Sequence, residues 1–116
     1  MRWSRDGASL IFRSPNSSQP GLWKAPLNGG EPVFFITSKG GSHISFSPQY
    51  DLIMDVIGHK EMWVTPLRGE PLRKIFEFSD PEIRIDYPVW SPDGKWVLFD
   101  RVKPQGGDIW LVDNIE

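Results

Sequence analysis

Short apolar segments alternate along the whole chain with polar segments that are rich in glycine and proline. Residues 10–12, 52–54 and 96–99 are three such segments, and each is apolar at successive rather than alternating positions. Continuous apolar runs of this length are typical of strands that are buried on both faces of a sheet. No window of helical length shows a 3.6-residue apolar period, so the pattern predicts an all-β fold of many short strands.

One motif with a leading aromatic residue occurs three times. Its copies are Trp3-Ser4-Arg5-Asp6-Gly7, Phe46-Ser47-Pro48-Gln49-Tyr50 and Trp90-Ser91-Pro92-Asp93-Gly94. The leading aromatic residues lie 43 and 44 positions apart, which is typical of the blade period in a four-stranded β-propeller. A tryptophan-bearing segment and a Gly-Glu-Pro segment follow in the same order. Their positions are 22–27, 62–67 and 109–114 for the first, and 30–32 and 69–71 for the second.

The motif also predicts a turn within each repeat. In Ser-Pro-Asp-Gly the proline presets φ, the aspartate can bond its own backbone, and the glycine accepts a positive φ. The inner strand of a propeller blade precedes this turn, so we expect blades at residues 1–41, 42–85 and 86–116. The first blade would keep only the end of its inner strand, and the last would lack its outer strand. The prediction is a partial β-propeller of about two and a half four-stranded antiparallel blades.

The second repeat departs most from this pattern. Gln49-Tyr50 replaces Asp-Gly, and tyrosine disfavours a positive φ. Asp55 stands where the other repeats have Phe12 and Phe99, which places a carboxylate at an expected packing position. We expect Asp55 to hydrogen-bond a neighbouring backbone, with a role in a polar pocket as the alternative.

Composition excludes several classes of protein. The net charge is −2 and the lysines and arginines are scattered singly, so no nucleic-acid partner is predicted. The chain has no cysteine, which excludes disulfides and thiolate metal sites. No segment approaches the roughly 20 apolar residues that a membrane crossing needs, and the first residues do not read as a signal peptide.

The third repeat carries a resemblance to a known family. Its Trp-Ser-Pro-Asp-Gly-Lys opening and the segment Asp108-Ile109-Trp110-Leu111-Val112-Asp113 resemble the WD-like repeat of TolB-like propellers. They are also similar to blades of prolyl oligopeptidase-type and tricorn-type peptidases. The resemblance covers essentially the whole chain and implies a propeller that serves as a binding platform. A TolB-like parent would imply a periplasmic location, and other parents a cytoplasmic one.

Catalytic chemistry is not predicted. The sequence contains no Gly-x-Ser-x-Gly elbow, and the nearest segment, residues 40–43, reads as a loop between blades. His43 and His59 are the two histidines of the chain, and neither has a partner at a metal-ligand spacing along the sequence. Phosphate-binding loops are absent as well. We therefore expect neither an enzyme nor a metal site, and no cofactor.

The candidate binding surface comes from the loops that precede the inner strands. Aligning the repeats places Ser42-His43 opposite Asp86-Tyr87, with residues 38–41 and 82–85 as the loops that lead into them. His43, Arg84, Asp86 and Tyr87 would form a mixed-charge recognition surface, and ordinary loop polarity is the alternative. The predicted function is a non-catalytic protein- or peptide-binding or scaffold module. The alternatives are a substrate-gating segment of a prolyl oligopeptidase-type peptidase and the sensor domain of a larger regulator.

The number of blades raises a separate question. Closed propellers have about four to eight blades, and each blade buries its faces on its neighbours. Fewer than three blades would leave apolar faces exposed at both ends. We therefore expect either a longer parent protein or a homo-oligomer in which copies complete the propeller.

Overall fold

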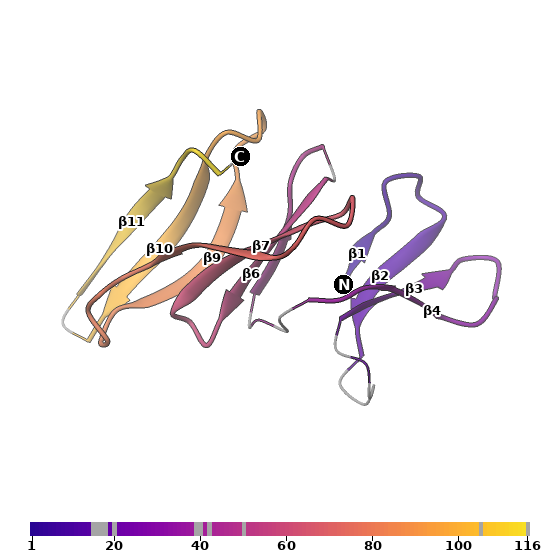
Figure 1. Ribbon diagram of the computed structural model, residues 1–116, viewed down its shortest axis with the longest axis horizontal. Coiled ribbons are helices and arrows are strands. Elements are labelled where there is room, and N and C mark those ends of the chain that lie inside the picture. The colour runs from indigo at the N-terminus through magenta and orange to yellow at the C-terminus, as the bar shows by residue number, and fades with distance from the viewer. Residues whose placement is uncertain are drawn as a thin grey trace. The chain divides into compact units, whose positions relative to one another are not determined.

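The computed structural model describes residues 1–14, 19, 21–38, 41, 43–49, 51–104 and 106–115. These residues form three antiparallel sheets, two of four strands and one of three (Figure 1). Among them there is no helix with the length and apolar character that a membrane crossing requires. The chain divides into two compact units, residues 1–40 and 41–116, and each is described by itself.

The first unit is a single four-stranded sheet. Its strands follow chain order: β1 (Arg2–Trp3), β2 (Ser9–Arg13), β3 (Leu22–Pro26) and β4 (Val33–Ile36). Ile11 and Leu22 are its buried apolar side chains, and the rings of Trp23 and Phe34 meet edge to face at 5.7 Å. The residues before the first serine turn form the two-residue β1.

The second unit contains two sheets that pack on each other. The first consists of β5 (His43–Phe46), β6 (Leu52–Ile57), β7 (Glu61–Pro66) and β8 (Arg73–Glu77). The second consists of β9 (Arg84–Trp90), β10 (Val97–Lys103) and β11 (Gly106–Val112). Each sheet is a meander of sequential antiparallel strands, as expected for a propeller blade. We refer to these sheets as blade 2 and blade 3.

The repeated motif forms the turn into the second strand of its sheet. Ser91 Oγ donates a hydrogen bond to Asp93 Oδ1 at 2.6 Å and accepts one from the backbone N–H of Trp96. Gly94 has φ +73°, which confirms the predicted turn chemistry. In blade 2 the serine is Ser47, and its hydroxyl donates instead to Asp51 Oδ1 at 2.7 Å. The aspartate has thus moved to the end of the turn, and Tyr50 lies outside the described residues.

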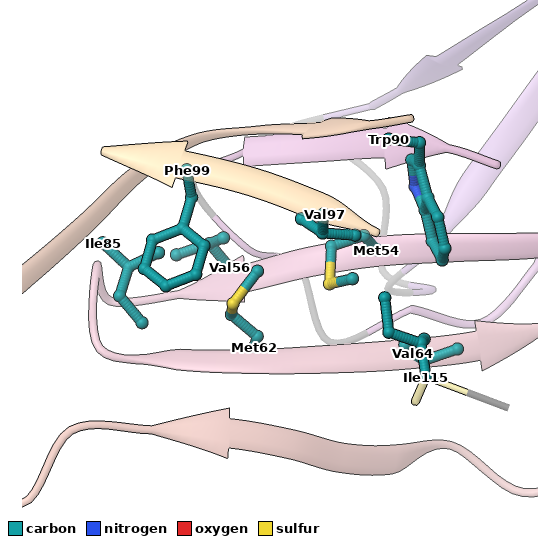
Figure 2. Packing of buried hydrophobic residues seen from close by; sticks show 9 residues of the cluster. All are labelled: Met54, Val56, Met62, Val64, Ile85, Trp90, Val97, Phe99 and Ile115. Carbon is teal, nitrogen blue, oxygen red and sulfur yellow. The ribbon is translucent and has the colours of Figure 1, made fainter. Parts of the chain in front are cut away.

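The core of the second unit lies between its two blades. Met54, Val56, Met62 and Val64 project from blade 2 and are fully buried against blade 3 (Figure 2). The residues of the third repeat that complete the cluster are Ile85, Trp90, Val97, Phe99 and Ile115. The indole N–H of Trp90 donates to the carbonyl of Ser45 on β5, so a hydrogen bond also joins the blades. Burial on both faces of β6 confirms the reading of its continuous apolar run.

Blade 3 differs from the sequence-based expectation in two respects. Strand β9 begins at Arg84, so residues 84–87 lie within a strand rather than in a loop before it. The strand that was expected at residues 96–99 continues as β10 to Lys103, where it pairs with Gly106 of β11. Cross-strand pairing explains the longer strands. Arg101 lies opposite Asp108, and their ion pair allows these polar residues to occupy strand positions.

The apolar run of β10 is buried on one face only, so the expectation of burial on both faces is wrong for this strand. Phe99 is 1% exposed, whereas its neighbour Leu98 is 40% exposed. Leu98 pairs with Leu111 on one side and Val89 on the other, and all three side chains are exposed. Blade 3 therefore presents an apolar stripe on the face that points away from blade 2.

Candidate functional site

Three elements of the second unit bring polar side chains together at one end of its blades. His43 begins β5, His59 lies in the turn between β6 and β7, and Asp86 lies in β9. Both imidazoles reach the same carboxylate oxygen. His43 Nε2 lies 3.1 Å from Asp86 Oδ1, and His59 Nδ1 hydrogen-bonds to that atom as well. All three side chains are partly exposed, so the cluster is open to solvent.

A tight turn between β6 and β7 holds His59 in place. The backbone N–H of Lys60 donates to the carbonyl of Ile57 at 2.9 Å, and Gly58 and His59 have φ +55° and +59°. These angles are those of a type I′ hairpin turn, which favours glycine or asparagine at both central positions. Histidine is tolerated in this left-handed region but is uncommon there.

Hydrogen bonds join the same turn to the segment that leads into β9. The N–H of Ile85 donates to the carbonyl of His59 at 2.7 Å. The ammonium of Lys60 donates to the carbonyl of Ile83 at 2.6 Å. These bonds fix the turn against the start of β9, and they explain why His59 lies beside Asp86.

An irregularity in β9 places the remaining residues. The register between β9 and β10 shifts between Leu98 and Asp100, where β9 has one extra residue. Tyr87 lies at this bulge with φ +51°, and its side chain is 67% exposed. Its ring lies 4.8 Å from the His43 ring. Bulges of this kind re-aim side chains at functional sites.

The cluster contains one permanently charged side chain, that of Arg84. Arg84 Nη2 lies 4.0 Å from Asp86 Oδ2, and the Arg84 side chain is 52% exposed. Burial raises the pKa of Asp86, but hydrogen bonds from His59 and His43 and the charge of Arg84 outweigh it, so this pKa lies below its ordinary value. Asp86 is therefore a carboxylate acceptor at neutral pH.

The four residues predicted from the repeat alignment lie together in the structure. His43 contacts both Asp86 and Tyr87, and Arg84 lies beside them. Their role in binding stays a prediction. Ser42 and residues 39–40, which belong to the predicted loop, lie outside the described residues.

His59 was missed as a member of this cluster. Its spacing along the sequence indicated no partner, and the structure places it in the turn between β6 and β7, where it reaches Asp86. The available signal was topological: the turn between the second and third strands of a blade lies at the end where the inner strand begins.

The architecture of the described residues is that of a partial β-propeller. It combines sequential meander sheets, repeated serine turns and a buried core between blades 2 and 3. No protein-family model matches the sequence, and neither does any curated protein.

Comparison with solved structures adds a particular relative in fold. The chain is similar to a structure from Agrobacterium tumefaciens whose protein is provisionally designated TolB, with a TM-score of 0.64 and 20% sequence identity. The match covers 96% of this chain and 40% of that one, so the chain spans about two fifths of the length of the protein it matches. At this identity the likeness shows the fold alone.

Proposed function

We propose that the chain is a non-catalytic module that recognises a protein or peptide partner through the surface formed by His43, Arg84, Asp86 and Tyr87. The observation that carries this proposal is the exposure of Tyr87 and Arg84 on β9, a strand that pairs with β10. Tyrosine and arginine are enriched among residues that dominate binding energy at protein interfaces. Here both are exposed on β9, whereas Ile85 on the same strand is fully buried.

The chemistry of the surface suggests the kind of group it would bind. The carboxylate of Asp86 is already engaged by two imidazoles, which leaves the guanidinium of Arg84 as the charge available to a partner. A guanidinium pairs best with a planar carboxylate. An exposed tyrosine ring offers an apolar face beside it. We therefore expect a peptide that carries a carboxylate next to an apolar side chain.

A non-catalytic role is supported by the sequence. The full chain has no nucleophile elbow of the kind used by propeller-linked serine peptidases. A substrate-gating segment or a sensor domain would use the same recognition step and would differ in the domain that accompanies the blades.

Selection from a displayed peptide library, with the full chain as bait, tests this function. Selected peptides should bind the wild-type chain saturably and should lose about 10-fold or more in affinity for Arg84→Ala and Tyr87→Ala. Arg68→Ala is the matched control, because Arg68 lies in the turn between β7 and β8 at the opposite end of blade 2. Peptides that bind both site variants as well as the wild type would contradict the proposal.

A further inference from the structure

We propose that His43, His59 and Asp86 form a binding site for a divalent transition-metal ion of the zinc class. The three donor atoms are His43 Nε2, His59 Nδ1 and an Asp86 carboxylate oxygen, and they all lie within 4.8 Å of one another. Zinc binds imidazole nitrogen and carboxylate oxygen at about 2.0–2.2 Å, which places neighbouring ligand atoms about 3.3 Å apart. Small side-chain movements would therefore close the site around an ion.

The donor set matches this class of ion. Two imidazoles and one carboxylate suit zinc and its neighbours, whereas calcium and magnesium prefer an all-oxygen set. A neutral imidazole that hydrogen-bonds Asp86 through one ring nitrogen would carry its proton on the other ring nitrogen once it coordinates an ion. The two hydrogen bonds to Asp86 would then be replaced by three coordinate bonds, one from each ligand. Three protein ligands leave a position open to water or to an exogenous ligand.

The convergence of the ligands is the strongest argument. The chain contains two histidines in 116 residues, and both reach the same carboxylate oxygen from different strands and turns. The backbone bond from Ile85 to His59 holds two of the ligands in register across the blades. Metal sites depend on ligands that are held in position in this way.

The conformation of His59 is a second, independent observation. Its position in the type I′ turn has φ +59°, where glycine or asparagine would be favoured. Left-handed conformations at non-glycine residues persist where the surrounding structure holds them, and they cluster at functional sites. Glycine would adopt this backbone conformation at lower cost, so the imidazole is the feature that histidine adds at this position.

The surroundings of the cluster fit a single coordinating oxygen. Arg84 lies beside Asp86 Oδ2, while both imidazoles lie beside Oδ1. The guanidinium would orient the carboxylate so that Oδ1 faces the ion, as outer-shell partners of metal ligands do. The absence of a metal site was predicted from spacing along the sequence, and that criterion could not detect ligands that lie 27 and 43 positions apart.

Calorimetric titration of the full chain with Zn²⁺ tests the site. The wild type should bind one ion per chain, and Asp86→Asn should weaken binding by about 10-fold or more. His59→Gly is the sharper variant, because glycine suits the turn and the chain should remain folded by circular dichroism while affinity falls to the same degree. Asp113→Asn is the control, since it removes an exposed carboxylate outside the cluster and should leave the affinity unchanged.

Cobalt provides a readout that loss of folding would not mimic. Co²⁺ bound to imidazole and carboxylate in a low-coordinate site absorbs in the visible range, and this absorption should appear with the wild type and disappear with His59→Gly. Absence of saturable Zn²⁺ binding to the wild type, or equal affinity of the folded His59→Gly variant, would overturn the proposal. Neither outcome bears on peptide recognition, which is tested at Arg84 and Tyr87.

Discussion

Replacing Phe99 with alanine should reveal how strongly blades 2 and 3 are held together. Phe99 lies on β10 and is 1% exposed. Its ring lies 5.8 Å from that of Phe76 and 6.2 Å from that of Phe78, both on or just after the outer strand of blade 2. The substitution removes an aromatic side chain from the buried cluster between the blades and leaves a cavity there.

The expected loss is large compared with the stability of the chain. Phenylalanine-to-alanine changes in cores cost about 3–5 kcal/mol, because lost transfer free energy adds to the cost of the cavity. A chain of 116 residues has a free energy of unfolding of roughly 6–17 kcal/mol. Phe99→Ala should therefore remove a substantial share of that stability, and Phe99→Leu a smaller one of about 1–2 kcal/mol.

Urea denaturation followed by tryptophan fluorescence measures the effect. With a slope of about 1–3 kcal/mol per molar urea, a loss of 3–5 kcal/mol shifts the midpoint by about 1.5–2.5 M for a slope near 2. Leu98→Ala is the matched control, since Leu98 is adjacent on the same strand but 40% exposed on the opposite face. Its cost should stay below about 1 kcal/mol at low protein concentration.

Two results for these variants would contradict a packed core between blades 2 and 3. Equal losses for Phe99→Ala and Leu98→Ala would mean that the outer face of blade 3 is as well covered as the inner one. A loss below about 1 kcal/mol for Phe99→Ala would mean that the two blades do not share a packed core.

Three further outcomes are expected. The hydrogen bond from Ser91 lowers the pKa of Asp93, so Ser91→Ala should raise that pKa toward its ordinary value in a carboxyl NMR titration. Because the folded-state pKa is lowered, the stability that this bond contributes is present above the ordinary carboxyl pKa and is lost as the pH falls through the lowered value. The exposed stripe of blade 3 should make the chain self-associate with rising concentration, and Leu98→Glu should keep it monomeric by sedimentation velocity. Gly41→Ala should cost about 1–3 kcal/mol in urea denaturation, because an added Cβ would lie 2.4 Å from the carbonyl oxygen of Val56.

The fold could be predicted from the sequence because the repeat encodes it locally. Ser91, Asp93 and Gly94 form their turn through contacts a few residues apart, and such contacts follow from residue type. The apolar runs predicted strands for the same reason. The extent of β9 was missed, since Arg84 and Asp86 are polar and join the strand through pairing with β10, which no local pattern reports.

The site could be predicted only in part, and the reason is again physical. Alignment of the repeats placed His43 opposite Tyr87, because equivalent positions of adjacent blades lie side by side in a propeller. His59 has no equivalent in that alignment. Its contact with Asp86 depends on how closely the turn of blade 2 approaches blade 3, and the hydrogen bonds of Ile85 and Lys60 that hold the turn there are not reported by any local pattern.

The departures from the repeat therefore carry more functional information than the repeat itself. The serine turns and the apolar strands recur because each blade must bury the same faces, and residues that satisfy this requirement cannot distinguish one blade from the next. His43 and Tyr87 occupy equivalent positions but differ in chemistry, and the bulge at Tyr87 interrupts a register that packing would otherwise keep regular. His59 holds a backbone conformation that glycine would adopt at lower cost. His43 and His59 both hydrogen-bond Asp86, and Tyr87 follows Asp86 in the sequence. The requirements of the fold do not explain why these departures from the repeat lie around one carboxylate.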